Sequence, residues 1–169
     1  MGSSPPPKKI LVMTYDDEYL NSLAKIIVRT PIKIDSEIGF AHMTLPRKNM
    51  IITLLSCPMR KVWIHHFTGT KASIIIYEGD DVTERNMEII SMLSNDKLKK
   101  TPSLILLDKK KNDSEKEYQR RIGLEELRKE LSKRNLTYNV MEVDFDDITS
   151  KSEVLYGVEW IEKEIKVIS

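Results

Sequence analysis

Short apolar runs separated by polar segments dominate the pattern of this chain. Five of them are rich in β-branched or aliphatic residues and end at polar or turn residues, which is typical of β-strands. They cover Ile10–Met13, Met50–Leu55, Ser73–Tyr77, Leu104–Leu107 and Val140–Val143. Four of these runs are nearly continuous hydrophobics, as expected of strands buried on both faces. A weaker run, Ile38–Leu45, is joined to Met50–Leu55 by the turn Pro46–Asn49, which predicts an antiparallel hairpin.

Helical periodicity fills the segments between these runs. Apolar residues from Leu20 to Ile27 recur at helical spacing and stop before Thr30-Pro31. Further helices are predicted at Val82–Leu93, at Leu124–Leu131 and along the stripe Val154, Val158, Ile161 and Ile165. This alternation predicts an α/β fold: a mostly parallel six-stranded sheet with one antiparallel edge strand and helices on both faces. Ligands bind such sheets at the carboxyl ends of the strands, so chemistry is expected in the loops after Met13, Tyr77, Leu107 and Val143.

The length fits one domain, and the nearly equal numbers of basic and acidic residues and the single cysteine are typical of an intracellular protein. Residues 1–8 carry a Ser-Ser-Pro-Pro-Pro stretch without an apolar segment, so we predict a disordered lead-in followed by a domain over 9–169. The formal charge of +1 in 169 residues argues against nucleic acid as a partner and allows only weak or indirect membrane association. Pro6 stands where the N-myristoylation pattern of Gly2 wants Ser or Thr. A single cysteine, Cys57, and the lack of a bilayer-long apolar run predict a cytoplasmic location.

The loop between the first strand and the first helix, Thr14–Asn21, aligns with a phosphate cradle of the G-x-x-x-x-G-K-[ST] type but lacks its chemistry. The glycine positions hold Thr14 and Tyr19, the lysine position holds Leu20, and the hydroxyl position holds Asn21. Carboxylates also crowd the place where an anion would sit, namely Asp16, Asp17 and Glu18, and like charges repel. These acids are interpreted as helix caps rather than as a metal or acid–base site, and we predict no metal site elsewhere.

Several stretches carry a family resemblance in this order along the chain. They are Ile38-Gly39-Phe40, the turn Lys48-Asn49, the segment Val62-Trp63-Ile64-His65-His66-Phe67, the strand and acidic turn Ala72–Asp81, and the closing helix Leu155–Ile161. Together with the order of elements, they resemble the Arf/Sar family of small GTPases from about Lys9 to about Ile165. The resemblance implies a small-GTPase-like fold of the P-loop NTPase type.

The same resemblance identifies positions where the nucleotide-binding motifs are degenerate. The magnesium-binding switch threonine is Glu37, the magnesium-side aspartate loop is Ser56-Cys57-Pro58, and the base-reading Asn-Lys-x-Asp falls on Asp108-Lys109-Lys110-Lys111. A lysine at the last of these positions would meet the donors of a guanine ring with another donor. The last loop, around Ile148, keeps only a backbone N–H for the guanine carbonyl. The degenerate positions are Thr14, Asp16, Asp17, Tyr19, Leu20, Asn21, Glu37, Ser56, Asp108, Lys109, Lys111 and Ile148.

We therefore predict a pseudo-GTPase without bound GTP, GDP or other cofactor and without GTPase activity, serving as a protein-interaction module or structural subunit of a larger assembly. Its switch segments, Ile32–Leu45 and Ser56–Lys61, would then be fixed by protein contacts, since phosphate and magnesium contacts are missing. The predicted partner surface comprises Phe40, Met43, Trp63, Lys109, Lys110 and Lys111. Two alternatives stay open: a divergent, active GTP-binding protein of intracellular membrane traffic, and a domain that binds another small ligand in the same cleft.

Overall fold

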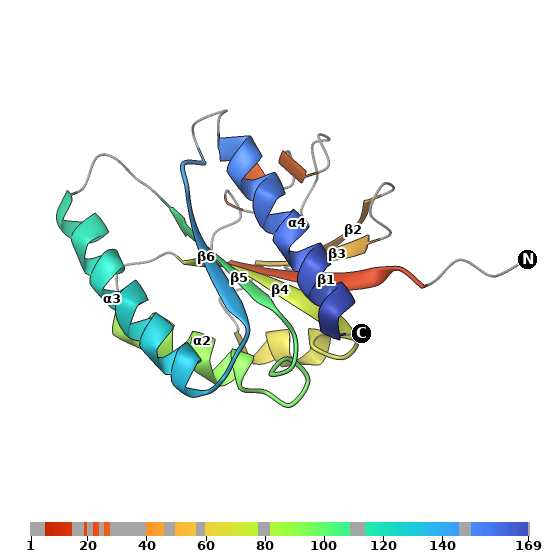
Figure 1. The fold of residues 1–169 in the computed structure, drawn as a ribbon, viewed down its shortest axis with the longest axis horizontal. Coiled ribbons are helices and arrows are strands. Elements are labelled where there is room, and N and C mark those ends of the chain that lie inside the picture. The colour runs from red at the N-terminus through yellow and green to blue at the C-terminus, as the bar shows by residue number, and fades with distance from the viewer. Residues whose placement is uncertain are drawn as a thin grey trace, which may run out of the picture.

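A computed structural model describes the fold of the chain (Figure 1). The described residues are 6–14, 19, 22–23, 26–27, 40–45, 50–56, 60–77, 82–108, 114–145 and 150–168. Residues 1–5 of the predicted lead-in lie outside them, and the first strand begins at Lys8, one residue before the predicted domain boundary.

Within the described part, one mixed sheet contains strands β1 to β6 in the order β2-β3-β1-β4-β5-β6. The antiparallel pair β2 and β3 places β2 at one edge, and every other pair is parallel, which confirms the predicted sheet. The strands are β1 (Lys8–Thr14), β2 (Phe40–Leu45), β3 (Met50–Ser56), β4 (Thr70–Tyr77), β5 (Ser103–Asp108) and β6 (Tyr138–Val143).

Helices cover both faces of this sheet, as predicted (Figure 1). The regular helices are α2 (Val82–Leu93), α3 (Ser114–Lys133) and α4 (Ser150–Ile168), and a 3-10 helix, η1, spans Arg60–His66. α3 is much longer than the predicted Leu124–Leu131. The prediction missed its first turns because they are polar and carry little apolar periodicity. Ser22, Leu23, Ile26 and Ile27 are helical and fall in the first predicted helix, and Tyr19, which the sequence places in the preceding loop, is helical as well. No helix in the described part is both long and apolar enough to cross a bilayer.

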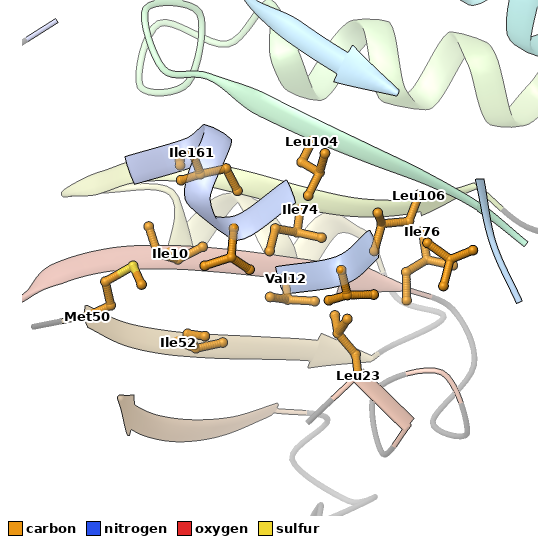
Figure 2. Packing of buried hydrophobic residues seen from close by; sticks show 14 of the residues in the cluster. Ile10, Val12, Leu23, Met50, Ile52, Ile74, Ile76, Leu104, Leu106 and Ile161 are labelled. Carbon is orange, nitrogen blue, oxygen red and sulfur yellow. The ribbon is translucent and has the colours of Figure 1, made fainter. Parts of the chain in front are cut away.

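Alternate residues of β1, β4, β5 and β6 build two cores, because successive side chains of a strand point to opposite faces. Ile10 and Val12 pack with α4 and Leu23 on one face (Figure 2). Leu11 and Met13 pack on the other face with residues of α2, α3 and η1. The near-continuous apolar runs in the sequence reflect this burial on both sides.

A buried hydrogen-bond chain fixes α2 and α3 to the end of β4. The Tyr77 hydroxyl donates to Asn86 Oδ1 at 2.7 Å, and Asn86 Nδ2 donates to the Gly123 carbonyl at 2.7 Å. Burial raises the pKa of Tyr77 well above its ordinary value, so its phenol stays a donor. Gly123 lies so close that an added Cβ would be 2.6 Å from the Tyr77 hydroxyl and 2.8 Å from Val82 Cβ. α3 therefore approaches α2 and the end of β4 so closely at residue 123 that a side chain larger than that of glycine would require neighbouring atoms to shift.

Candidate functional site

Predicted site positions converge at the carboxyl edge of the parallel strands. β1 ends at Thr14, β3 ends at Ser56 and β5 ends at Asp108. Thr14 pairs with Ser56 in the register of β1 and β3, and Asp108 pairs with Val143 in the register of β5 and β6. Thr14 and Asp108 are buried. These strand ends lie at the edge of the sheet where the sequence analysis predicts a site.

Tyr19 links this edge to the segment that follows β1. Its hydroxyl donates a hydrogen bond to Asp108 Oδ2, a contact between residues 89 positions apart in the chain. Its ring also meets the ring of Phe145 edge to face, with the ring centroids 5.1 Å apart and the planes at 72°. Such aromatic pairs and charge-assisted hydrogen bonds each stabilise a packed contact. The Tyr19 side chain therefore links a residue that follows β1 to the last residue of β5 and to the segment just after β6.

Both aromatic residues of this cluster are half-buried and pack against the core on the α4 face. Phe145 was missed by the sequence analysis. The sequence gives little indication of a role for Phe145, because it is a single aromatic residue in a polar stretch, two positions beyond the end of β6. We call Tyr19, Asp108 and Phe145 the Tyr19 cluster.

A second set of contacts holds the end of η1 against the sheet. Lys9 Nζ donates to the carbonyl of His66 and, at 3.1 Å, to the carbonyl of Thr68. Thr70 Oγ1 donates to the same His66 carbonyl at 3.3 Å. Burial lowers the pKa of Lys9, as expected for an ammonium partly withdrawn from water. Side chains of β1 and β4 thus fix the C-terminal end of η1.

Trp63 lies inside the molecule, which corrects its assignment to a partner surface. Its side chain is 1% exposed and belongs to the core on the α2 and α3 face, whereas the next residue, Ile64, is 46% exposed. The 3-10 turn points neighbouring side chains in different directions, so one anchors η1 and the other faces solvent. Sequence alone could not assign these two faces, because a single short turn has no repeating apolar pattern.

Other predicted positions are placed only by backbone or not at all. Phe40 and Met43 lie on the edge strand β2, where they pair with Leu55 and Ile52 of β3. The remaining predicted positions lie outside the described residues: Asp16, Asp17, Leu20, Asn21, Glu37, Lys109, Lys110, Lys111 and Ile148. Within the described residues, no group of three or more His, Cys, Asp or Glu side chains is arranged to hold a metal ion.

Replacing Tyr19 with Phe should lower the free energy of unfolding by about 1–3 kcal/mol, because the buried Asp108 carboxylate loses a donor while the ring packing stays. Urea denaturation followed by circular dichroism measures this loss. Tyr156→Phe on α4 is the control, since that side chain is 63% exposed and its change should stay within about 0.5 kcal/mol. Equal stability of the two variants would contradict a structural role for the Tyr19–Asp108 bond.

Comparison with known proteins agrees with this fold. The model of the ADP-ribosylation factor (Arf) family matches residues 23–165, beginning just after the loop Thr14–Asn21. A solved structure of the Arl6 (BBS3) small GTPase from Trypanosoma brucei, with the bound nucleotide analogue GppNp, has a similar fold. The TM-score is 0.71 with 12% identity, and the match covers 96% of this chain and 99% of that one. No curated protein sequence matches the chain. Because the family model matches most of its length, the chain belongs to the Arf family.

Proposed function

We propose that this Arf-family domain acts as a protein-interaction module or structural subunit without bound guanine nucleotide. The observation that carries the proposal is the Tyr19 cluster at the carboxyl edge of the sheet. By its resemblance to the family motifs, the sequence places Tyr19 at a glycine position of the phosphate cradle and Asp108 at the first position of the base-reading motif. The side chain of Tyr19 thus spans between segments that serve the two ends of a nucleotide.

Shape and charge both favour this interpretation. A phosphate cradle uses glycine so that backbone N–H groups can approach the anion closely. A phenol at that position takes up the space, and its hydroxyl is already committed to Asp108. The buried carboxylate adds a negative charge near the place where a nucleotide would bring more. Nucleotide binding would have to break the Tyr19–Asp108 bond and move the ring away from Phe145.

The contacts of η1 supply what a nucleotide would otherwise provide. In GTPase switches, contacts to the terminal phosphate and magnesium hold the switch segments in their active order. Here the region that follows the second switch is held by the buried Trp63 and by Lys9 on the His66 carbonyl. We infer that this region keeps one conformation, so that partner binding is constitutive rather than nucleotide-dependent.

A second candidate function is that of a divergent GTP-binding protein of membrane traffic. The observation in its favour is the fold likeness to a small GTPase that binds GppNp. This function would need the Tyr19 ring to swing out. It would also need a phosphate contact from another residue, such as Lys25 or a lysine of the segment Lys109–Lys111.

The deciding experiment is to measure the nucleotide released when gently purified protein is denatured. We expect no stoichiometric GDP or GTP, and no rise in melting temperature when GTP and Mg²⁺ are added. A ligand present at about 100 times its dissociation constant would stabilise the fold by about 2.7 kcal/mol, which a melting assay detects easily. Stoichiometric nucleotide in the protein would overturn the proposal. If the unmodified protein holds no nucleotide, a Tyr19→Gly variant tests the reason. Nucleotide binding by this variant would show that the Tyr19 side chain prevents binding in the unmodified protein.

A further inference from the structure

An open, mostly apolar groove runs between η1 and α2, away from the Tyr19 cluster. It has a volume of about 600 Å³ and is lined by Ile64, Phe67, Glu84, Met87, Glu88, Ser91, Met92 and Asn95. Two of these are large apolar side chains that face solvent: Ile64 is 46% exposed and Met87 is 68% exposed. α2 lies against α3 along its other flank (Figure 1), so the flank toward η1 is the one left open.

The shape of the groove suits a helix. Its α2 wall consists of residues spaced three and four apart from Glu84 to Asn95, which is one continuous stripe of the helix surface and its C-terminal turn. At 1.5 Å per residue this stripe extends over roughly 16 Å, the length of about three helical turns. Helices recognised in this way insert apolar side chains at positions i, i+3 or i+4, and i+7.

The lining also specifies the chemistry of the occupant. Met87 and Met92 are flexible and polarisable, which is typical of surfaces that accept apolar side chains of another helix. The charged residues among the eight lining residues are both acidic, Glu84 and Glu88, one turn apart. The Glu88 side chain is only 17% exposed and pairs with Arg85 at 3.4 Å, so Arg85 offsets part of its charge. Glu84 is exposed, and its carboxylate contributes to the acidic character of this wall.

We propose that this groove binds an amphipathic helix of a partner protein, with an apolar stripe and a lysine or arginine beside it that faces Glu84 and Glu88. The inference rests on the proposed function, because it names the partner class of a constitutive interaction module. Apolar burial supplies affinity, and the two carboxylates supply selectivity, since an acidic helix would be repelled.

Selection from a phage library of 16-residue helical peptides, with apolar and charged positions randomised, tests the proposal on the full chain. We expect enrichment of peptides that combine an apolar stripe with Lys or Arg next to it. A synthetic copy of an enriched peptide should lose about tenfold or more in affinity for the variant Ile64→Asp with Met87→Asp, measured by fluorescence anisotropy. Glu84→Lys should weaken the same peptide severalfold, because it reverses a charge at the groove.

Two controls test whether a loss of peptide affinity comes from the groove itself. Tyr156→Asp alters an exposed side chain of α4, on the opposite face of the sheet, and should leave the peptide affinity unchanged. Both groove substitutions are at exposed residues, and unfolding curves check that the fold is retained. Three results would overturn the proposal: no enrichment, enrichment of acidic peptides, or equal affinity of the peptide for the Ile64→Asp, Met87→Asp variant. A concentration-dependent dimer of the unmodified chain that this variant abolishes would also overturn it, by identifying a second copy as the occupant.

The binding assay is repeated with added GTP and Mg²⁺ to separate this inference from the proposed function. Peptide binding that needs nucleotide would leave the groove assignment intact and contradict the constitutive module. Absence of groove binding both with and without GTP and Mg²⁺ would contradict the helix proposal alone.

Discussion

Trp63→Ala is expected to lower the free energy of unfolding by about 3–5 kcal/mol, because it removes a large, fully buried aromatic side chain and leaves a cavity. The Trp63 side chain is 1% exposed and lies in the core shared by β1, β4, β5, α2 and α3. It is also the residue that fixes η1 to this core. Urea denaturation measures the loss, and peptide affinity at the groove should fall as well, since η1 supplies Ile64 and Phe67 directly follows η1.

Ile64→Ala is the matched control for this prediction. It lies next to Trp63 on the same 3-10 helix, but its side chain is 46% exposed and its removal should cost less than about 1 kcal/mol. If Trp63→Ala lost no more stability than Ile64→Ala, the indole would not be the anchor of η1.

Gly123→Ala is expected to destabilise the fold by about 1–3 kcal/mol through overpacking. Within a helix, this substitution would ordinarily gain up to about 1 kcal/mol from helix propensity, so the sign itself is diagnostic. The new Cβ would lie 2.6 Å from the Tyr77 hydroxyl and 2.8 Å from Val82 Cβ. The hydroxyl is bound to Asn86, and Val82 Cβ is fixed by its backbone, so neither atom can move without shifting α2.

A second glycine and a double mutant test this cause. Gly157→Ala, also in a helix, would meet the ends of the Leu104 and Met141 side chains at 2.7 Å and 3.0 Å. These ends are flexible, so a smaller loss is expected. Tyr77→Phe removes the nearest atom, and the loss caused by Gly123→Ala should be smaller in that background than in the unmodified chain. Additive losses of Tyr77→Phe and Gly123→Ala would show that the hydroxyl is not the obstacle.

Together, these two anchors join both walls of the groove to the core. Trp63 holds η1 to the core, while the hydrogen bonds from Tyr77 through Asn86 to Gly123 hold α2 to α3 and to the end of β4. A groove with fixed walls binds a helix at a lower entropic cost than a mobile one. This arrangement fits the proposed interaction module, in which partner binding needs no switch.

The amino-acid sequence by itself determined the class of fold and the order of its elements. Burial of each strand on both faces leaves continuous apolar runs such as Leu104–Leu107, and these are visible without coordinates. The amphipathic stripe of α4 was likewise readable, since its periodicity records which face meets the sheet. The prediction missed the long polar start of α3, because those turns are polar and show no apolar periodicity that would indicate a helix.

Only the tertiary structure decided which side chains meet. The sequence predicts Tyr19 at a glycine position of the cradle, but the contacts of Tyr19 with Asp108 and Phe145 bridge 89 and 126 positions and depend on how the ends of β5 and β6 pack against Tyr19. The burial of Trp63, the exposure of Ile64 and the groove between η1 and α2 likewise depend on how the short helix η1 packs against the core. Local periodicity encodes burial within one element, whereas contacts between distant elements arise only when the chain is folded.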